Sequence, residues 1–293
     1  KKLTELAVNN IQNTLKKLDI DLNTCVLDWN EVSDIQLSML KASTPDSEIP
    51  TDHAIRAVLQ KYANKFNIKY ILNGRNFTTE GISPWAWTYS ALDWKYIKNI
   101  HKRYGLNPIK NYPYFSMIGL LKSASFDRVK QISILNYINF TKDNAIKVLK
   151  DELNWRDYGG KHYESIYTRF FQSYILPVKF GYDKRRSYLS VLIITGQLKR
   201  EDALKMIKEP TYPDDLMQQD REYVIKKFKL SEAEFEKIIE SPLKTFKDYK
   251  NNSKLLYLHK NKITPVIIRI LKKLKIIPKH FAANLVPVDN SDE

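Results

Sequence analysis

The sequence predicts an α/β layer built on a parallel sheet, followed by a mainly helical part. Helical and strand-like periodicities alternate up to residue 72, a pattern typical of a parallel sheet with flanking helices. After Glu80 most segments have helical spacing. Hydrophobic residues make up 43% of the 293 residues, and 18 Tyr and 12 Phe are among them. The chain can therefore bury a sizeable core with aromatic packing.

The beginning of the chain predicts a helix, a strand and a second helix. Residues 3–18 carry apolar side chains at helical spacing, and residues 30–41 predict the second helix. Between them, the apolar run 23–29 (NTCVLDW) predicts a buried strand. Cys25 is then a small core residue, and as the one cysteine of the chain it excludes an internal disulfide and a CxxC zinc site.

A third helix and a second strand follow the proline-containing loop 43–50. Thr51 and Asp52 are predicted to cap that helix. The short run 68–72 (IKYIL) predicts the strand, which ends at an Asn-Gly turn. The predicted apolar face of the helix consists of Ala54, Ile55, Val58, Leu59 and Tyr62.

Most of the remaining chain predicts helices. A strand is expected within 127–137, Thr141 should cap a helix over 142–153, and Ser231 with Glu234 forms a capping-box pattern. We expect three regions: 1–125 as a partial α/β domain, 126–250 as a mainly helical substrate-binding region, and 251–293 as a basic amphipathic tail.

The net charge of +15 indicates either an anionic partner or lysines that solvate helix surfaces, and both interpretations stay open because the lysines are spread along the chain. No run of 18 apolar residues predicts a membrane-spanning helix. The chain starts without Met and within a predicted helix, so we expect sequence upstream of Lys1.

Ligands of open parallel sheets bind beyond the carboxyl ends of the strands. The second predicted strand ends at Asn73-Gly74-Arg75-Asn76, which leads to Thr79 and Glu80. Glycine admits a close backbone approach, and the polar side chains suit a ribose, a phosphate or a hydrated cation, although an ordinary turn has the same pattern. Neither a Walker-type loop nor a GxGxxG motif is present.

The stretch 155–186 concentrates Gly, His, Asp and Arg. After Gly159-Gly160 a helix is expected up to Pro177, with Tyr167, Phe170, Phe171 and Tyr174 as a buried stripe. His162, Ser165, Arg169 and Gln172 would share another face, with Glu164 beside them. Lys161 and His162 at a helix N-terminus suggest a bound anion, and the arginines of DKRR suit phosphate or carboxylate.

Several segments together resemble the N-acetyl sugar amidotransferases: WRDYGGKHYES, TRFFQSYILPVKFGYDKRR, KASTPDSEIPTDHAI and ILNGRNFTTEGISPWAW. The resemblance covers residues 3–250 and implies the PP-loop ATP pyrophosphatase group with an adenine-nucleotide-hydrolase-like fold. Such enzymes use ATP to activate an N-acetyl oxygen of an acidic sugar, so that ammonia can replace it and leave an acetamidino group. The resemblance implies the cofactors ATP and Mg²⁺, a glutaminase subunit and a cyclase-like subunit as ammonia sources, and a cytoplasmic location in surface polysaccharide or flagellin glycan biosynthesis.

The family's SGGxDS phosphate loop is absent from this chain, so it should lie upstream, and the 293 residues alone should be inactive as an ATP pyrophosphatase. Asp46 and Asp52 would lie in a loop that closes over the site. The remaining expectations by residue are catalysis by His162, Glu164 and Asp52, nucleotide binding by Asn73, Gly74, Asn76, Thr79 and Glu80 (with Glu80 also toward the metal), and acidic-sugar binding by Arg156, Asp157, Gly160, Lys161, Arg169, Asp183, Lys184, Arg185 and Arg186.

Two alternatives stay open. The first is a PP-loop tRNA-modifying enzyme, which the positive charge suits but the absence of cysteine pairs does not. The second is a non-enzymatic module that binds nucleic acid or a membrane surface. The helix after Gly196 has acidic side chains at its start, which disfavour contact with DNA, so no nucleic-acid partner is expected. The basic segment 260–279 could rest on the inner face of an anionic membrane.

Overall fold

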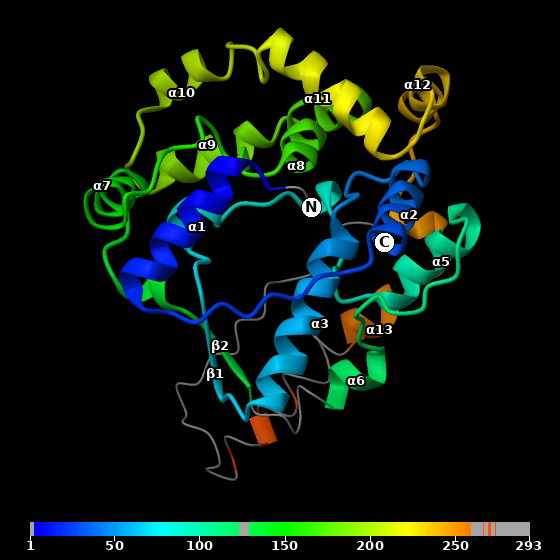
Figure 1. Cartoon of the computed structure of the whole chain (residues 1–293), viewed down its shortest axis with the longest axis horizontal. Coiled ribbons are helices and arrows are strands. Elements are labelled where there is room, and N and C mark those ends of the chain that lie inside the picture. The colour runs from blue at the N-terminus through cyan, green and yellow to red at the C-terminus, as the bar shows by residue number, and fades with distance from the viewer. Residues whose placement is uncertain (1–2, 123–128, 259–265, 267–268, 271–272, 274–293) are drawn as a thin grey trace.

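The described part of the protein consists mainly of helices, together with one small parallel sheet (Figure 1). The computed structural model describes residues 3–122, 129–258, 266, 269–270 and 273. Within these residues the sheet consists of β1 (Tyr70–Asn73) and β2 (Lys130–Ser133). The predicted fold class, a parallel sheet with flanking helices followed by a mainly helical part, is confirmed.

The first two helices begin at side-chain caps. The hydroxyl of Thr4 accepts the N–H of Ala7 at the start of α1 (Glu5–Leu18). The carboxylate of Asp28 accepts the N–H groups of Asn30 and Glu31 and starts α2 (Trp29–Lys41). Such caps satisfy backbone donors that the first helical turn leaves unpaired.

The predicted strand over 23–29 is wrong. Residues 23–28 have no regular secondary structure, and Val26 is 87% exposed. Cys25 is exposed as well, so its assignment to the core is also wrong. An apolar run forms a strand only where another strand pairs with it, and here the cap at Asp28 starts a helix instead.

The third helix, α3 (Ile49–Lys65), begins earlier than predicted. Its N-cap is Glu48, which makes no side-chain cap bond, and Pro50 occupies the first turn, where its missing N–H is not needed. Thr51 and Asp52 are therefore helical residues and not caps. The predicted apolar face is also rotated: Ile55 and Leu59 are 51% and 41% exposed, and the buried face contains Ile49, Pro50, His53, Ala54, Ala57 and Ala63.

The two strands pair in parallel, with Tyr70 opposite Lys130 and Asn73 opposite Ser133. The strand expected at 68–72 is thus present in a slightly shifted position, and the one expected within 127–137 is present too. β2 belongs to the predicted region 126–250 but pairs with a strand of the region 1–125. The three-region division itself stays a prediction.

The second half is a succession of helices, and its caps agree with the sequence. Thr141 caps α7 (Lys142–Leu153), and Ser231 with Glu234 forms the predicted capping box of α12 (Glu232–Glu240). Figure 1 shows α10 and α11 arching over α8 and α9. The helices there are α8 (Ile166–Phe170), η4 (Phe171–Phe180), α9 (Lys184–Ile194), α10 (Arg200–Met206) and α11 (Asp214–Lys227).

Pro177 does not stop the helix, contrary to prediction. The α-helix α8 widens into η4, a π-helix that passes through Pro177 and ends at Gly181, whose φ is +68°. A proline ring in an α-helix clashes with the carbonyl four residues earlier, and the wider π-turn changes that spacing. Glycine then adopts the left-handed exit conformation without strain.

Two hydrophobic cores share α2. Leu37 and Leu40 belong to the core around α8, η4, α11 and α12, in which the predicted stripe residues Tyr167, Phe170 and Phe171 are buried. Ile35 and Met39 belong to the core that α2 forms with α5 (Trp94–Tyr104). α2 therefore joins the two halves of the protein.

The remaining elements are short, and they are α4 (Phe77–Glu80), η1 (Trp85–Trp87), α6 (Met117–Lys122), η3 (Ile134–Tyr137), η5 (Phe246–Asp248) and α13 (Ser253–Leu258). Among the residues described, no helix is long and apolar enough to cross a membrane. The segment 260–279, with its predicted membrane contact, lies almost wholly outside the described residues.

Candidate functional site

A cavity of about 550 Å³ lies where α4, the Gly159-Gly160 turn, η4 and α9 meet, and this volume suits a small-molecule ligand. Eight predicted site residues line it: Thr79, Glu80, Gly160, Lys161, His162, Asp183, Lys184 and Arg185. The lining also contains Ile82, Ser83, Trp87, Lys142, Gly159, Tyr163, Gln172, Ser173, Ser187, Tyr188, Leu189, Met206, Glu209 and Thr211.

Asn76 holds the α4 wall in place. Its buried side-chain oxygen accepts the N–H of Thr79 at 2.8 Å and the hydroxyls of Thr78 and Thr79, both at 2.9 Å. Gln197 also donates to the carbonyl of Thr78 at 2.8 Å, which ties α4 to the end of α9. Asn76 thus positions Thr79 and is not itself part of the cavity lining.

The turn that precedes α4 is held by Asn73, whose side-chain oxygen accepts the hydroxyl of Ser133 and the N–H of Arg75. Gly74 is exposed beside it. Neither Asn73 nor Gly74 lines the cavity, and nucleotide contacts by these residues stay a prediction.

The glycine turn brings the loop before α8 to the cavity. The carboxylate of Asp157 accepts the N–H of Gly159, whose φ is +82°. A Cβ at Gly160 would lie 2.7 Å from the ring of Tyr163, so only glycine fits without a shift. His162 has a φ of +66° and precedes the helix, which starts at the N-cap Ser165. The predicted helical face with His162, Ser165, Arg169 and Gln172 is therefore wrong.

His162 and Glu164 lie near each other. Nδ1 of His162 is 3.6 Å from Oε1 of Glu164, and both side chains are about one-third exposed. His162 reaches the cavity, whereas Glu164 is not part of its lining. A carboxylate at this distance can orient an imidazole that faces a ligand.

Lysines dominate one wall of the cavity. The ammonium groups of Lys142 and Lys161 lie 5.2 Å and 5.0 Å from the ring centre of Tyr188. Burial lowers the pKa of Lys161, Glu80 opposes this shift, and the positive charges of Lys184 and Lys142 add to it. The wall is thus a cluster of cations with Glu80 as the carboxylate that acts on Lys161.

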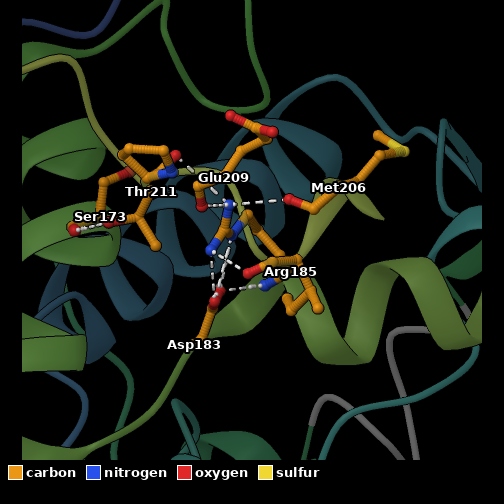
Figure 2. A network of polar contacts seen from close by, with 8 residues as sticks. Ser173, Asp183, Arg185, Met206, Glu209 and Thr211 are labelled. Atoms are coloured by element: carbon orange, nitrogen blue, oxygen red, sulfur yellow. Dashed lines mark hydrogen bonds and ion pairs between the residues drawn. The ribbon is translucent and has the colours of Figure 1, made fainter. Parts of the chain in front are cut away.

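The arginines of the DKRR segment do not belong to the lysine wall. Arg185 donates to the carboxylate of Asp183 at 2.8 Å and to backbone carbonyls of residues 206, 207, 209 and 210 (Figure 2). It therefore fixes the connection after α10 to the start of α9. Arg186 is exposed and does not line the cavity. Anion binding by either arginine stays a prediction.

Arg169 points into the fold. Its Nε and a terminal nitrogen donate to the two carboxylate oxygens of Asp220 at 2.7 and 2.8 Å, and the hydroxyl of Tyr212 donates to the same carboxylate. This geometry gives the guanidinium a partner within the protein. The predicted contact of Arg169 with an acidic ligand stays a prediction that this pairing disfavours.

Other predicted residues lie outside the cavity lining: Asp52, Arg156 and Asp157. Asp46 lies near the lysine wall, where its carboxylate accepts the hydroxyl of Thr88. Burial raises the pKa of Asp46 to about 6, although the Thr88 hydrogen bond and the charge of Lys184 oppose the shift.

The donors at this site fit an anion better than a free metal ion. The described residues contain no group of three or more His, Cys, Asp or Glu that could hold a metal. Glu80 supplies one carboxylate among several lysines, so Mg²⁺ there would need further oxygen ligands from a bound phosphate. ATP and Mg²⁺ binding stay predictions.

Three of the lining residues that the sequence motifs do not single out are Lys142, Tyr188 and Trp87. Lys142 begins α7, and Tyr188 belongs to α9. Trp87 lies in an aromatic loop, and its ring stacks on that of Tyr182 with centres 5.1 Å apart. The aromatic residues of SPWAWTYS were a visible signal, but the approach of Lys142 to Lys161 requires the fold.

Residues 164–264 match the family model of the C-terminal domain of WbpG-like lipopolysaccharide biosynthesis proteins. Comparisons with curated proteins and with solved structures found no match. The matched segment contains η4, α9 and the α10–α11 connection, which form much of the cavity wall. Residues 164–264, the WbpG-like domain, are thus similar to the C-terminal domain of these proteins, and the similarity covers about a third of the chain.

Proposed function

We propose that this chain is the sugar-amidating part of an ATP-dependent N-acetyl sugar amidotransferase of lipopolysaccharide biosynthesis. The reaction would convert the N-acetyl group of an acidic sugar to an acetamidino group with ammonia. One observation carries the proposal: the WbpG-like domain forms a single cavity with Thr79 and Glu80 of the ILNGRNFTTE segment, which resembles the nucleotide-binding segment of these enzymes.

Different walls of the cavity would bind the nucleotide and the sugar. Thr79 and Glu80 would face the nucleotide, and the lysine wall would face the acidic group of the sugar. His162, supported by Glu164, is suited to accept the proton that ammonia loses when it attacks the activated carbon. Ammonia would come from a glutaminase subunit, with a cyclase-like subunit beside it.

The test is the sugar composition of the lipopolysaccharide. Disruption of the gene for this chain should replace acetamidino sugars by their acetamido precursors, as measured by mass spectrometry of the released monosaccharides. Complementation with the complete wild-type gene should restore the amidino group. A His162→Asn gene should not restore it, although Asn tolerates the positive φ at this position. Unchanged acetamidino sugars after disruption would exclude the proposed function.

The matched control is Lys150→Gln. Lys150 is exposed in the last turn of α7 and does not line the cavity. This gene should restore acetamidino sugars as the wild type does.

A further inference from the structure

Lys142, Lys161 and Tyr188 form an arrangement whose charge is not balanced within the cavity. The two ammonium groups approach one aromatic ring at 5.2 and 5.0 Å. Lys184 acts on Lys161 as a third positive charge. The positive charges of the three lysines repel one another. The attraction between an ammonium group and an aromatic ring offsets this repulsion only weakly.

The neighbouring acidic groups do not cancel this charge. Asp183 is already engaged by Arg185 in a bond of 2.8 Å. Asp46, which acts on Lys184, accepts hydrogen bonds from Thr88 and from the N–H of Glu48. Glu80 is the carboxylate that acts on Lys161, and Glu209 also lines the cavity, so two negative charges face three lysines.

The fold fixes the lysines from separate elements. Lys142 is the first residue of α7, and its N–H donates to the side chain of Gln197 at 3.0 Å. Lys161 follows the Gly159-Gly160 turn, and Tyr188 projects from α9. The wall is therefore assembled by the tertiary structure, with Lys142 and Lys161 outside the WbpG-like domain and Tyr188 inside it.

We propose that Lys142 and Lys161, held against the ring of Tyr188, form with Lys184 a subsite that binds an oxyanion of the substrate, either a carboxylate or a phosphate. The assignment of this oxyanion to the sugar substrate rests on the proposed function, but the subsite itself does not. Glu80 is displaced as counter-ion when the oxyanion binds.

The test is isothermal titration calorimetry of the full chain at low salt with two probes, pyrophosphate and glucuronate. The preferred probe identifies the subsite as one for phosphate or for carboxylate. Lys142→Gln and Lys161→Gln should each weaken its binding by about tenfold, the usual effect of losing one charge-assisted hydrogen bond. Lys150→Gln removes the same charge from α7 away from the cavity and should not change the affinity.

Tyr188 provides a second readout. Tyr188→Leu removes the ring that orients both ammonium groups and should weaken binding, whereas Tyr188→Phe keeps the ring and should rescue most of the loss. Circular dichroism of each variant checks that it is folded. Absence of binding by both probes, or an equal loss in Lys150→Gln and Lys142→Gln, would overturn the subsite.

Failure of this proposal differs from failure of the proposed function. Lysine-dependent binding together with unchanged acetamidino sugars after gene disruption would keep the subsite and reject the amidotransferase. Lost acetamidino sugars without lysine-dependent binding would keep the amidotransferase and reject the subsite.

Discussion

Replacement of Arg169 by methionine should destabilise the fold. Arg169 makes two parallel bonds to Asp220 at 2.7 and 2.8 Å, and Asp220 is 4% exposed. The guanidinium also lies over the ring of Tyr163, 5.1 Å from its centre. Arg169→Met keeps much of the side-chain volume but leaves the carboxylate of Asp220 buried with only the hydroxyl of Tyr212 as a donor.

The expected loss is about 3–5 kcal/mol, because a buried charge without its partner keeps its full desolvation penalty. A protein of this size is stable by about 5–15 kcal/mol, so the variant retains a folded state with a much reduced margin. In the double variant Arg169→Met, Asp220→Leu both charges are gone. Its loss should be smaller than that of the single variant, since no buried charge remains.

Urea unfolding followed by circular dichroism measures both quantities. With an m-value of roughly 2–3 kcal/mol/M, the midpoint of Arg169→Met should fall by roughly 1–2.5 M. The reasoning fails if that midpoint is unchanged, or if the double variant is less stable than the single one. An unchanged midpoint together with weaker pyrophosphate binding would instead return Arg169 to the anion-binding role predicted from the sequence.

Three further perturbations test the site and its supports. Asp46 has a folded pKa of about 6 against an ordinary value of 3.8, so its stabilising contribution is complete below pH 3.8 and is lost as the pH rises through about 6. The unfolding free energy from urea titrations should fall across this window by up to about 3 kcal/mol in the wild type and by less in Asp46→Asn. Equal pH dependence in the two proteins would contradict the assignment. The ammonium of Lys179 in η4 donates to three backbone carbonyls at the end of α12. Lys179→Met should therefore lower the unfolding free energy by about 1.5–3 kcal/mol. The control is Lys237→Met in α12, whose exposed side chain should leave the unfolding free energy nearly unchanged. Gly160→Ala forces the ring of Tyr163 to move into new space at the cavity wall and should weaken pyrophosphate binding in calorimetry; wild-type affinity would show that the ring yields freely.

Local signals in the sequence predicted much of the fold. Caps such as Thr141 and Ser231 act within one helical turn, and the aromatic stripe from Tyr167 to Tyr174 follows helical periodicity, so both are visible without the tertiary structure. The apolar run with Val26 shows the opposite case. Its strand prediction depended on a pairing partner that the fold does not supply.

The sequence motifs predicted several residues of the candidate site but not the contacts that these residues make. Glu80, Lys161 and Lys184 were selected from their motifs, and the fold brings them to one cavity. The bond of Arg169 to Asp220 spans 51 positions in sequence, so no local pattern indicates that this arginine is engaged. His162 does not belong to the helix predicted for it, because the turn gives it a positive φ. The spacing of side chains in the sequence does not indicate such a backbone conformation.

The π-helix η4 makes the binding wall sensitive to chain length. A π-helix accommodates more residues per turn than an α-helix, so each residue of η4 contributes less than the roughly 100° of an α-helical residue. Deletion of one residue between Phe171 and Phe180, with the winding kept, would rotate the part after the deletion by that angle relative to the part before it. Gln172 and Ser173 lie before the exit at Gly181, and Lys184 lies after it. The two sides of the cavity wall are thus held in phase by the number of residues in η4, and a single insertion or deletion would misalign them without replacing any residue that lines the cavity.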